Sequence, residues 1–418
     1  MSVFGLLAAV GSFIKIRYLY DKAVIDNPAF RLHYRFTSAF FFASCILITA
    51  FDLFGKPIDC TSKNAIRIEV VNTYCWITST FTFYNESIGR TTKIGPNIHP
   101  GVGPSMKGNG ERYHSYYQWV PFVLFLQGVL FYLPHWIWKV YEDHRIKTMT
   151  EGFRGFQLKS ADDAGRRQRR SELYDYFNGM VRCHSELMYV HVVCEILNFV
   201  NAIGNIYFID KFLGGYFLAY GSRVIEFSGM DQEDRHDPMI ETFPRMTKCT
   251  WRQFGPSGTV EEQDALCMLP INIIHEKIYI FIWFWLIILS VISAVALVYR
   301  FMALAFPRVR VFVFNRQTTS LTSSNKVVIP RLPVGDFFIL SLIGKNLDGV
   351  LFSELMKDLE LNLKNTPLKR SFSFRRRPSA YGWKSDLNIL EESKPSNDSQ
   401  HVAAYTVHEN EVKFPSID

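Results

Sequence analysis

The chain has 418 residues, of which 48% are hydrophobic and 15% aromatic. It is too apolar for two or three ordinary soluble domains, and this composition favours a membrane protein with polar loops. The net charge is +7, but Lys and Arg are scattered along flanks and tails, which argues against a nucleic-acid-binding protein and favours membrane lipids as the partner of this charge.

The first residues have an apolar repeat with helical spacing. Val3, Leu6 and Val10 share one face, which is typical of an amphipathic helix. The basic residues Lys15 and Lys22 follow this stretch instead of preceding it, so we expect no cleaved signal peptide. Periodicity alone leaves two positions open for this helix: flat on the membrane, or folded into the mouth of a channel.

Four apolar runs are long enough to cross a membrane, which requires about 20 helical residues. Their even number places both termini on the same side. In the fourth run Arg300 is the only charged residue and lies near one end, so we expect its side chain to extend toward lipid headgroups. The four runs are 36–54, 117–138, 187–209 and 278–306.

The third run contains polar residues at helical spacing: His191, Glu195, Asn198, Asn201 and Asn205. They follow one another at intervals of three or four residues, so they share one stripe of a helix. A polar stripe inside a membrane must face protein or water. Two roles therefore stay open, namely hydrogen bonding between helices or subunits and the lining of an aqueous pore.

The segment after the first run, 55–116, is rich in β-branched and aromatic residues. We predict short strands over 66–71 and 76–83, the second because threonines alternate there with apolar residues. The stretch 95–110 contains many Gly and Pro residues and is expected to form a surface loop.

Seven cysteines occur, and four of them lie on the side of the membrane opposite the termini. Cys60 and Cys75 follow the first run, and Cys249 and Cys267 follow the third. An even set on one side is typical of disulfides formed in an oxidising compartment. The spacings lack the short C-x-x-C pattern of zinc sites, so we predict disulfides and no bound metal. Four cysteines allow three pairings, and spacing does not choose among them.

Nothing in the sequence is typical of an enzyme. It contains no G-x-S-x-G or H-E-x-x-H motif, and its histidines are dispersed. The Gly-rich pieces 101–103 and 108–110 lack the strand-to-helix context of a phosphate-binding loop. We therefore expect no catalytic residue, no cofactor and no enzymatic activity.

A distinctive motif stands at the start of the second run, composed of Tyr116, Tyr117, Gln118, Trp119 and Val120. It resembles the signature of the innexin family, which lies at the same place relative to a membrane span. Further similar pieces extend the resemblance over residues 1–365. They include 26–34, 57–60, 74–76, 243–245, 269–272 and 334–338.

The resemblance implies an all-α transmembrane four-helix subunit with a small α+β disulfide-linked extracellular domain and a helical cytoplasmic domain. It also implies cytoplasmic termini and the disulfide pairs Cys60 with Cys267 and Cys75 with Cys249. The expected layout is a cytoplasmic N-terminal segment 1–35, spans 36–54, 117–138, 187–209 and 278–306, extracellular loops 55–116 and 210–277, a cytoplasmic loop 139–186, a cytoplasmic C-terminal domain 307–369 and a disordered tail 370–418.

The function implied by the resemblance is a gap-junction channel that passes ions and small metabolites between adjacent cells. Eight copies are expected to form a hemichannel ring in the plasma membrane, and this ring is expected to dock with a ring on the adjacent cell at a cell–cell junction. Other innexin subunits are further candidate partners. Ser2, Val3 and Phe4 are expected to line a funnel at the cytoplasmic mouth of the pore.

A glycosylation sequon begins at Asn85, in the first extracellular loop. This feature departs from the expectation of a docked channel, because a sugar at Asn85 would obstruct docking. Two alternatives to the junction channel follow. The first is an undocked hemichannel that releases small molecules from the cell. The second is a four-span adhesion or scaffold protein that uses its loops for contact.

Overall fold

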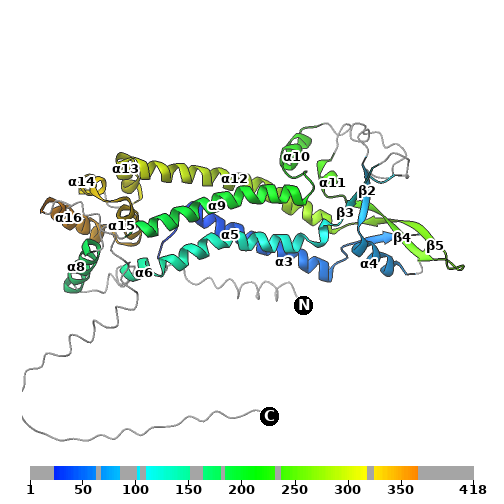
Figure 1. The fold of residues 1–418 in the computed structure, drawn as a ribbon, viewed down its shortest axis with the longest axis horizontal. Helices are drawn as coiled ribbons and strands as arrows, with labels where there is room; N and C mark the ends of the chain where they lie inside the picture. Colours follow the sequence, from blue (N-terminus) through cyan, green and yellow to red (C-terminus); the bar gives the residue numbers. More distant parts are fainter. Residues whose placement is uncertain are drawn as a thin grey trace, which may run out of the picture. The chain divides into compact units, whose positions relative to one another are not determined.

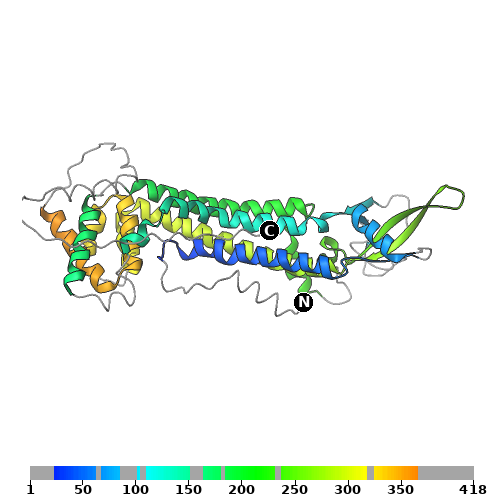
Figure 2. The ribbon, with the colours of Figure 1, turned by 90° about the horizontal axis from the view of Figure 1, so that it is seen from below.

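A computed structural model describes residues 23–62, 67–84, 101–103, 110–150, 163–179, 184–230, 237–317 and 324–365. Four long helices in these residues form a bundle (Figure 1). A five-stranded antiparallel sheet lies at one end of this bundle, and a group of shorter helices lies at the other, as Figure 2 also shows. We call these the strand end and the helical end.

The bundle is closed, because α3 packs on α5 and α12, and α9 packs on the same two helices. Each long helix covers most of one of the four apolar runs, although α5 begins at Val120 and not at 117 and α12 ends at Ala305. Each is long and apolar enough to cross a membrane. The first consists of α2 (Pro28–Arg31), the π-helical η2 (Leu32–Thr37) and α3 (Ser38–Phe54), and the others are α5 (Val120–Glu142), α9 (Ser185–Phe212) and α12 (Ile271–Ala305).

The outer surface of the bundle is apolar, whereas its interior is filled. Leu47, Phe122 and Val298 are 54%, 68% and 62% exposed, which would be unfavourable in water and is not in lipid. The rings of Phe41 and Phe131 stack inside the bundle with their centroids 5.4 Å apart, and both side chains are buried. The bundle therefore has a packed core and an apolar outer surface.

A glycine allows α3 and α5 to approach closely. The Ser38 hydroxyl donates to the backbone carbonyl of Gly128 at 2.8 Å. A Cβ atom at Gly128 would lie 2.9 Å from the ring of Phe42, so a larger residue would push the two helices apart.

The sheet draws its strands from both segments that leave the strand end of the bundle. Its order is β1-β5-β4-β2-β3, and every pair is antiparallel. The strands from the segment after α3 are β1 (Asp59–Thr61), β2 (Thr80–Tyr84) and β3 (Gly110–His114), and those from the segment after α9 are β4 (Met246–Phe254) and β5 (Val260–Met268).

The strand predicted over 66–71 is wrong. Ile68–Thr78 forms the helix α4, and only the end of the second predicted strand is extended, as part of β2. Val71 and Cys75 are both buried and lie four residues apart, so they share a helical face. Burial of that face outweighs the strand preference of β-branched residues, which depends strongly on context.

Short helices complete both ends. At the strand end they are η4 (Tyr116–Gln118), α10 (Tyr220–Ser228) and α11 (Pro238–Thr242). At the helical end, α15 is almost entirely buried and packs on α6, α9 and α13. The elements of that end are α6 (Arg145–Thr150), α8 (Asp163–Gly179), α13 (Pro307–Gln317), α14 (Ser324–Val328), η6 (Ile329–Arg331), α15 (Val334–Asn346) and α16 (Gly349–Asn365).

The packing of α15 on α9 leads to a prediction. A Cβ atom at Gly335 would lie 2.7 Å from backbone atoms of Ser185 at the start of α9, and backbone cannot move aside as a flexible side chain can. Gly335→Ala is expected to lower the apparent melting temperature of the purified protein, because the free energy of unfolding falls by about 1–3 kcal/mol. Gly165→Ala in α8 is the control, because nothing lies within 4 Å of its added Cβ. Equal melting temperatures for the two variants would contradict the prediction.

Candidate functional site

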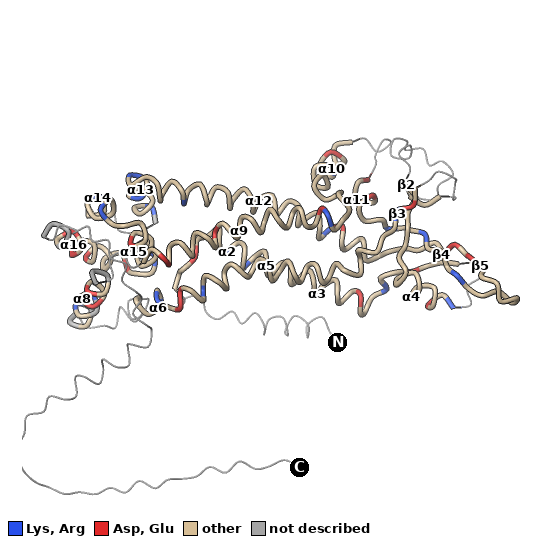
Figure 3. Tube along the Cα trace, in the orientation of Figure 1, with Lys and Arg blue, Asp and Glu red and all other residues tan. Residues whose placement is uncertain are grey.

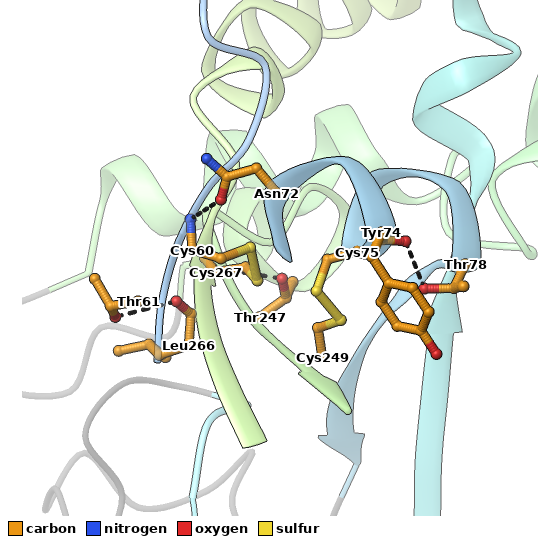
Figure 4. The surroundings of a disulfide bond; sticks show 10 residues. All are labelled: Cys60, Thr61, Asn72, Tyr74, Cys75, Thr78, Thr247, Cys249, Leu266 and Cys267. Carbon is orange, nitrogen blue, oxygen red and sulfur yellow. Dashed lines mark hydrogen bonds between the residues drawn. A yellow bond between two sulfur atoms is a disulfide. The ribbon is translucent and has the colours of Figure 1, made fainter. Parts of the chain in front are cut away.

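Two neighbouring disulfides join the segment after α3 to the segment after α9 (Figure 4). Cys60 of β1 is bonded to Cys267 of β5, and Cys75 of α4 is bonded to Cys249 of β4. The bonded residues are 207 and 174 positions apart in the chain, and all four side chains are buried. These are the pairs that the resemblance implies, and each links one segment to the other.

Contacts made by α4 bring the cysteines together. The backbone N–H of Cys60 donates to Oδ1 of Asn72 on α4 at 2.8 Å. The rings of Tyr74 on α4 and Trp251 on β4 meet edge to face, with centroids 4.8 Å apart. The helix therefore lies against β1 and β4 at once, which places Cys75 beside its partner strand.

The same geometry bears on the zinc alternative. The sulfur atoms of Cys60, Cys75 and Cys267 lie within 4.8 Å of one another, close enough to share a metal ion. Each of them already takes part in a disulfide, so none offers the thiolate that zinc binds. The arrangement supports a covalent brace rather than a metal centre.

The Tyr-Tyr-Gln-Trp-Val motif lies where the bundle meets the sheet. Tyr117 is fully buried, and its ring packs on Trp76 of α4 with centroids 4.6 Å apart. Nε2 of Gln118 donates to the backbone carbonyl of Trp76. Burial raises the pKa of the Tyr117 phenol to about 12, so it stays neutral. Tyr117 and Gln118 therefore both contact Trp76 on α4, the helix that carries Cys75.

The remaining motif residues face in different directions. Tyr116 packs on the ring of Phe243 with centroids 5.8 Å apart, and Val120, the first residue of α5, is fully buried. Trp119 is 61% exposed. An indole at this level of a membrane-crossing helix suits the interface between lipid and water.

A buried carboxylate that sequence reasoning missed also anchors the sheet to the bundle. The side chain of Glu276 on α12 has no exposed surface, and Nη2 of Arg245 donates to its Oε2 at 2.7 Å. This hydrogen bond raises the pKa of the Arg245 guanidinium. Nδ2 of Asn272, also on α12, donates to the carbonyl of Pro244 at 2.7 Å. The similar pieces 243–245 and 269–272 were the available signal, but spacing did not pair them.

The polar stripe of α9 faces protein. His191, Glu195, Asn198 and Asn205 are buried and Asn201 is half-buried. Glu195 receives two hydrogen bonds from Arg300 on α12, at 2.8 and 2.9 Å. The expectation that Arg300 extends toward headgroups is wrong, because its side chain is only 15% exposed and pairs inside the bundle. A guanidinium that is buried needs a counter-charge and hydrogen-bond acceptors, and the bidentate carboxylate of Glu195 supplies both.

Contacts at the helical end tie the chain before α2 to the same network. Nδ2 of Asn27 donates to Oε1 of Glu195 at 2.6 Å. Nζ of Lys345 on α15 donates to Oδ1 of Asn27 at 3.4 Å, and burial lowers the pKa of Lys345 to about 8. The side chain of Asn346 accepts from the N–H of Val24 at 2.7 Å and donates to its carbonyl at 2.9 Å. Residues 24–27 are therefore held by α9 and α15 together.

Two sets of predicted site residues cannot be placed. Ser2, Val3 and Phe4 of the expected funnel and the sequon residue Asn85 lie outside the described residues, as does most of the stretch 95–110. The disulfide cysteines, the signature motif and the stripe of α9 all lie within them.

Four apolar helices of membrane-crossing length and a disulfide-linked sheet at one end of their bundle define a multi-pass membrane protein. The innexin family model matches residues 26–363. Innexin inx3 of Drosophila melanogaster is 48% identical over 361 residues, which cover 86% of this chain and 90% of that protein. Innexin inx2 of Schistocerca americana is 41% identical over 87% of this chain and 99% of its own length.

The chain belongs to the innexin family. Innexins are subunits of gap-junction channels, and this protein is therefore a gap-junction channel subunit.

The disulfides give a testable stability difference. Cys75→Ser/Cys249→Ser removes the bridge across 174 residues and is expected to cost about 2–5 kcal/mol, seen as a lower apparent melting temperature in detergent. Cys45→Ser is the control, since Cys45 carries no disulfide. Non-reducing peptide mapping should recover Cys75 linked to Cys249. Finding Cys60 linked to Cys75 instead would contradict the pairing.

The ion pair in the bundle gives a second prediction. Glu195→Gln leaves the Arg300 guanidinium buried without a counter-charge, which is expected to cost about 3–5 kcal/mol. Glu195→Gln/Arg300→Gln should recover part of this loss, because neither charge remains. The control is Glu241→Gln, whose partner Arg223 is 48% exposed, so its effect should stay below about 1 kcal/mol. A thermal shift for Glu195→Gln no larger than that of the control would refute the role of the pair.

Proposed function

We propose that eight copies of this chain form a plasma-membrane hemichannel with the strand end outside the cell and the helical end in the cytoplasm. Two hemichannels on adjacent cells dock through their strand ends and pass ions and small metabolites between the cells. The role of each side chain in this channel is to build and hold the pore, and no chemistry is performed on the permeant.

The single observation that carries the orientation is the pair of disulfides at the strand end. Disulfides form and persist in oxidising compartments, and the cytosol keeps thiols reduced. The strand end therefore belongs outside. The contacts of Val24 with α15 lie at the opposite end of the bundle, which supports a cytoplasmic N-terminus.

The packed interior of one bundle supports a ring. Phe41, Phe131 and Leu286 are buried in its core with at most 1% of their surface exposed, so side chains fill the interior of the bundle that the structure describes. An aqueous pore must then form between copies, as closed rings of identical subunits provide. In this arrangement the stripe of α9 holds helices of one subunit together by hydrogen bonds, as Glu195 does with Arg300.

The N-terminal segment is assigned to the mouth of the pore. Val24 and Asn27 are fastened at the helical end, which is the end that we place in the cytoplasm, and this supports an N-terminal segment on the cytoplasmic side of the channel. Ser2, Val3 and Phe4 then form the funnel at its entrance. Selectivity follows from the width of this funnel and the charge of its lining.

Paired cells that express this chain alone provide the test. Junctional conductance measured by dual voltage clamp is expected in wild-type pairs and should be lost with Cys60→Ser/Cys267→Ser, because the bridge between the two loops is removed. Currents confined to unpaired cells would favour the undocked hemichannel, in which a sugar at Asn85 obstructs docking. Junctional plaques without conductance would favour the adhesion protein and overturn the channel.

A further inference from the structure

The β4–β5 hairpin extends beyond the rest of the sheet (Figure 1). The two strands pair along their whole length, from Met246 opposite Met268 to Phe254 opposite Val260. Their neighbours hold only the base, since β2 reaches β4 at Lys248 and β1 pairs with β5 at 266–268. In the part of the chain that the structure describes, no strand adjoins residues 249–254 or 260–265. We call this outer part of the hairpin the ribbon.

The ribbon has a cationic edge and an anionic edge. Within the ribbon β4 contains Arg252 and no acidic residue, whereas β5 contains Glu261, Glu262 and Asp264 and no basic residue. Lys248 lies at the base, where it pairs with Asp264 at 2.7 Å and is only 12% exposed. The charged positions can be followed along the two strands in Figure 3. Arg252 and Glu262 pair across the ribbon at 3.0 Å, yet their side chains remain 62% and 58% exposed. An ion pair this exposed satisfies little of either charge.

Free edges of this kind call for a partner. A two-stranded ribbon is only marginally stable in water, and an unpaired strand edge presents backbone groups that another strand can bind. The partner must offer an anionic strand to the β4 edge and a cationic strand to the β5 edge. A second copy of this chain offers both.

Strand direction decides how the second copy lies. In a ring, all ribbons point the same way along the ring axis, so the outward-running β4 of one copy lies beside the inward-running β5 of the next. That contact is antiparallel and joins opposite charges. Across a docked junction the ribbons point toward each other, so an antiparallel contact would place β4 against β4, with like charges facing.

We propose that neighbouring subunits of the ring bind each other through the ribbon, with Arg252 on the β4 edge of one copy against Glu261 and Glu262 on the β5 edge of the next. The inference rests on the proposed ring and specifies one of its contacts. The contact repeats around the ring and closes it, because each copy contributes one edge of each sign. Each ribbon thereby becomes part of a continuous outer collar.

Charge reversal with co-expression tests this contact. Arg252→Glu makes both edges of a copy anionic, and Glu262→Arg weakens the anionic edge and places a cation beside Arg252 of the next copy. Each variant alone is expected to form about tenfold fewer rings than wild type, measured as the ring fraction on size exclusion in detergent and by particle imaging. Co-expressed in one cell, the two variants should alternate and restore the ring fraction.

Co-expression separates this contact from the ion pair inside the ribbon. In each single variant the cross-ribbon pair at 252 and 262 becomes like-charged, and mixing chains does not repair it. Recovery on mixing can therefore come only from contacts between copies. Arg223→Glu, which disrupts an ion pair between α10 and α11, is the matched control and should form rings as wild type does. Peptide mapping of both disulfides verifies that each variant has folded.

The outcomes are distinct. Normal rings in both single variants, or no recovery on co-expression, would overturn the proposal. If recovery appears only as junctional conductance between a cell with one variant and a cell with the other, the contact lies across the junction and the proposal is wrong. Failure of the wild-type chain to form rings would instead refute the proposed function. A cross-linking experiment adds a further test. When Arg252→Cys and Glu262→Cys chains are expressed in one cell, we expect a disulfide-linked dimer that contains one chain of each kind.

Discussion

The covalent link between two distant segments is the constraint on which the strand end depends. β1 and β5 pair in the sheet although they come from segments separated by two membrane-crossing helices, and few residues join them. β1 has only three residues, so few ladder contacts hold its register on β5. The bond between Cys60 and Cys267, which are register partners, fixes it, and the bond between Cys75 and Cys249 fixes α4 on the next strand. Sheet order, the position of α4 and the projection of the ribbon all follow.

A second constraint operates inside the bundle, where charge is buried away from water. Glu195 and Arg300 lie on two helices that are far apart in the sequence. Their bidentate contact fixes the position of α9 along α12. Asn27 joins the same carboxylate, so the start of the first long helix is fixed to the other two. Lys345 extends the network to α15. The membrane-embedded part and the helical end are thereby coupled by polar contacts that lipid cannot replace.

Sequence reasoning found the features that depend on composition over a long window or on a residue type with few uses. The four apolar runs locate the long helices, the four cysteines locate the brace, and Tyr116 to Val120 mark the junction between bundle and sheet. It failed where tertiary contact decides. The strand preference of 66–71 was overruled by the buried face of α4, and Arg300 was treated alone because its partner Glu195 lies 105 residues away. Arg245 and Glu276 are only 31 residues apart, but no regular spacing links them, so their contact was missed as well. The pairing of the cysteines came from family resemblance, since spacing left three choices.

The two disulfides also determine the order of events while the chain is synthesised. Cys60 leaves the ribosome 207 residues ahead of Cys267, an interval of about 10–40 s at ordinary rates of synthesis. In the proposed orientation, Cys60 and Cys75 reach the oxidising side of the membrane before their partners do, because the second and third spans are synthesised in between. Both native bonds therefore form only after the segment that follows α9 has been synthesised, late in the making of the chain.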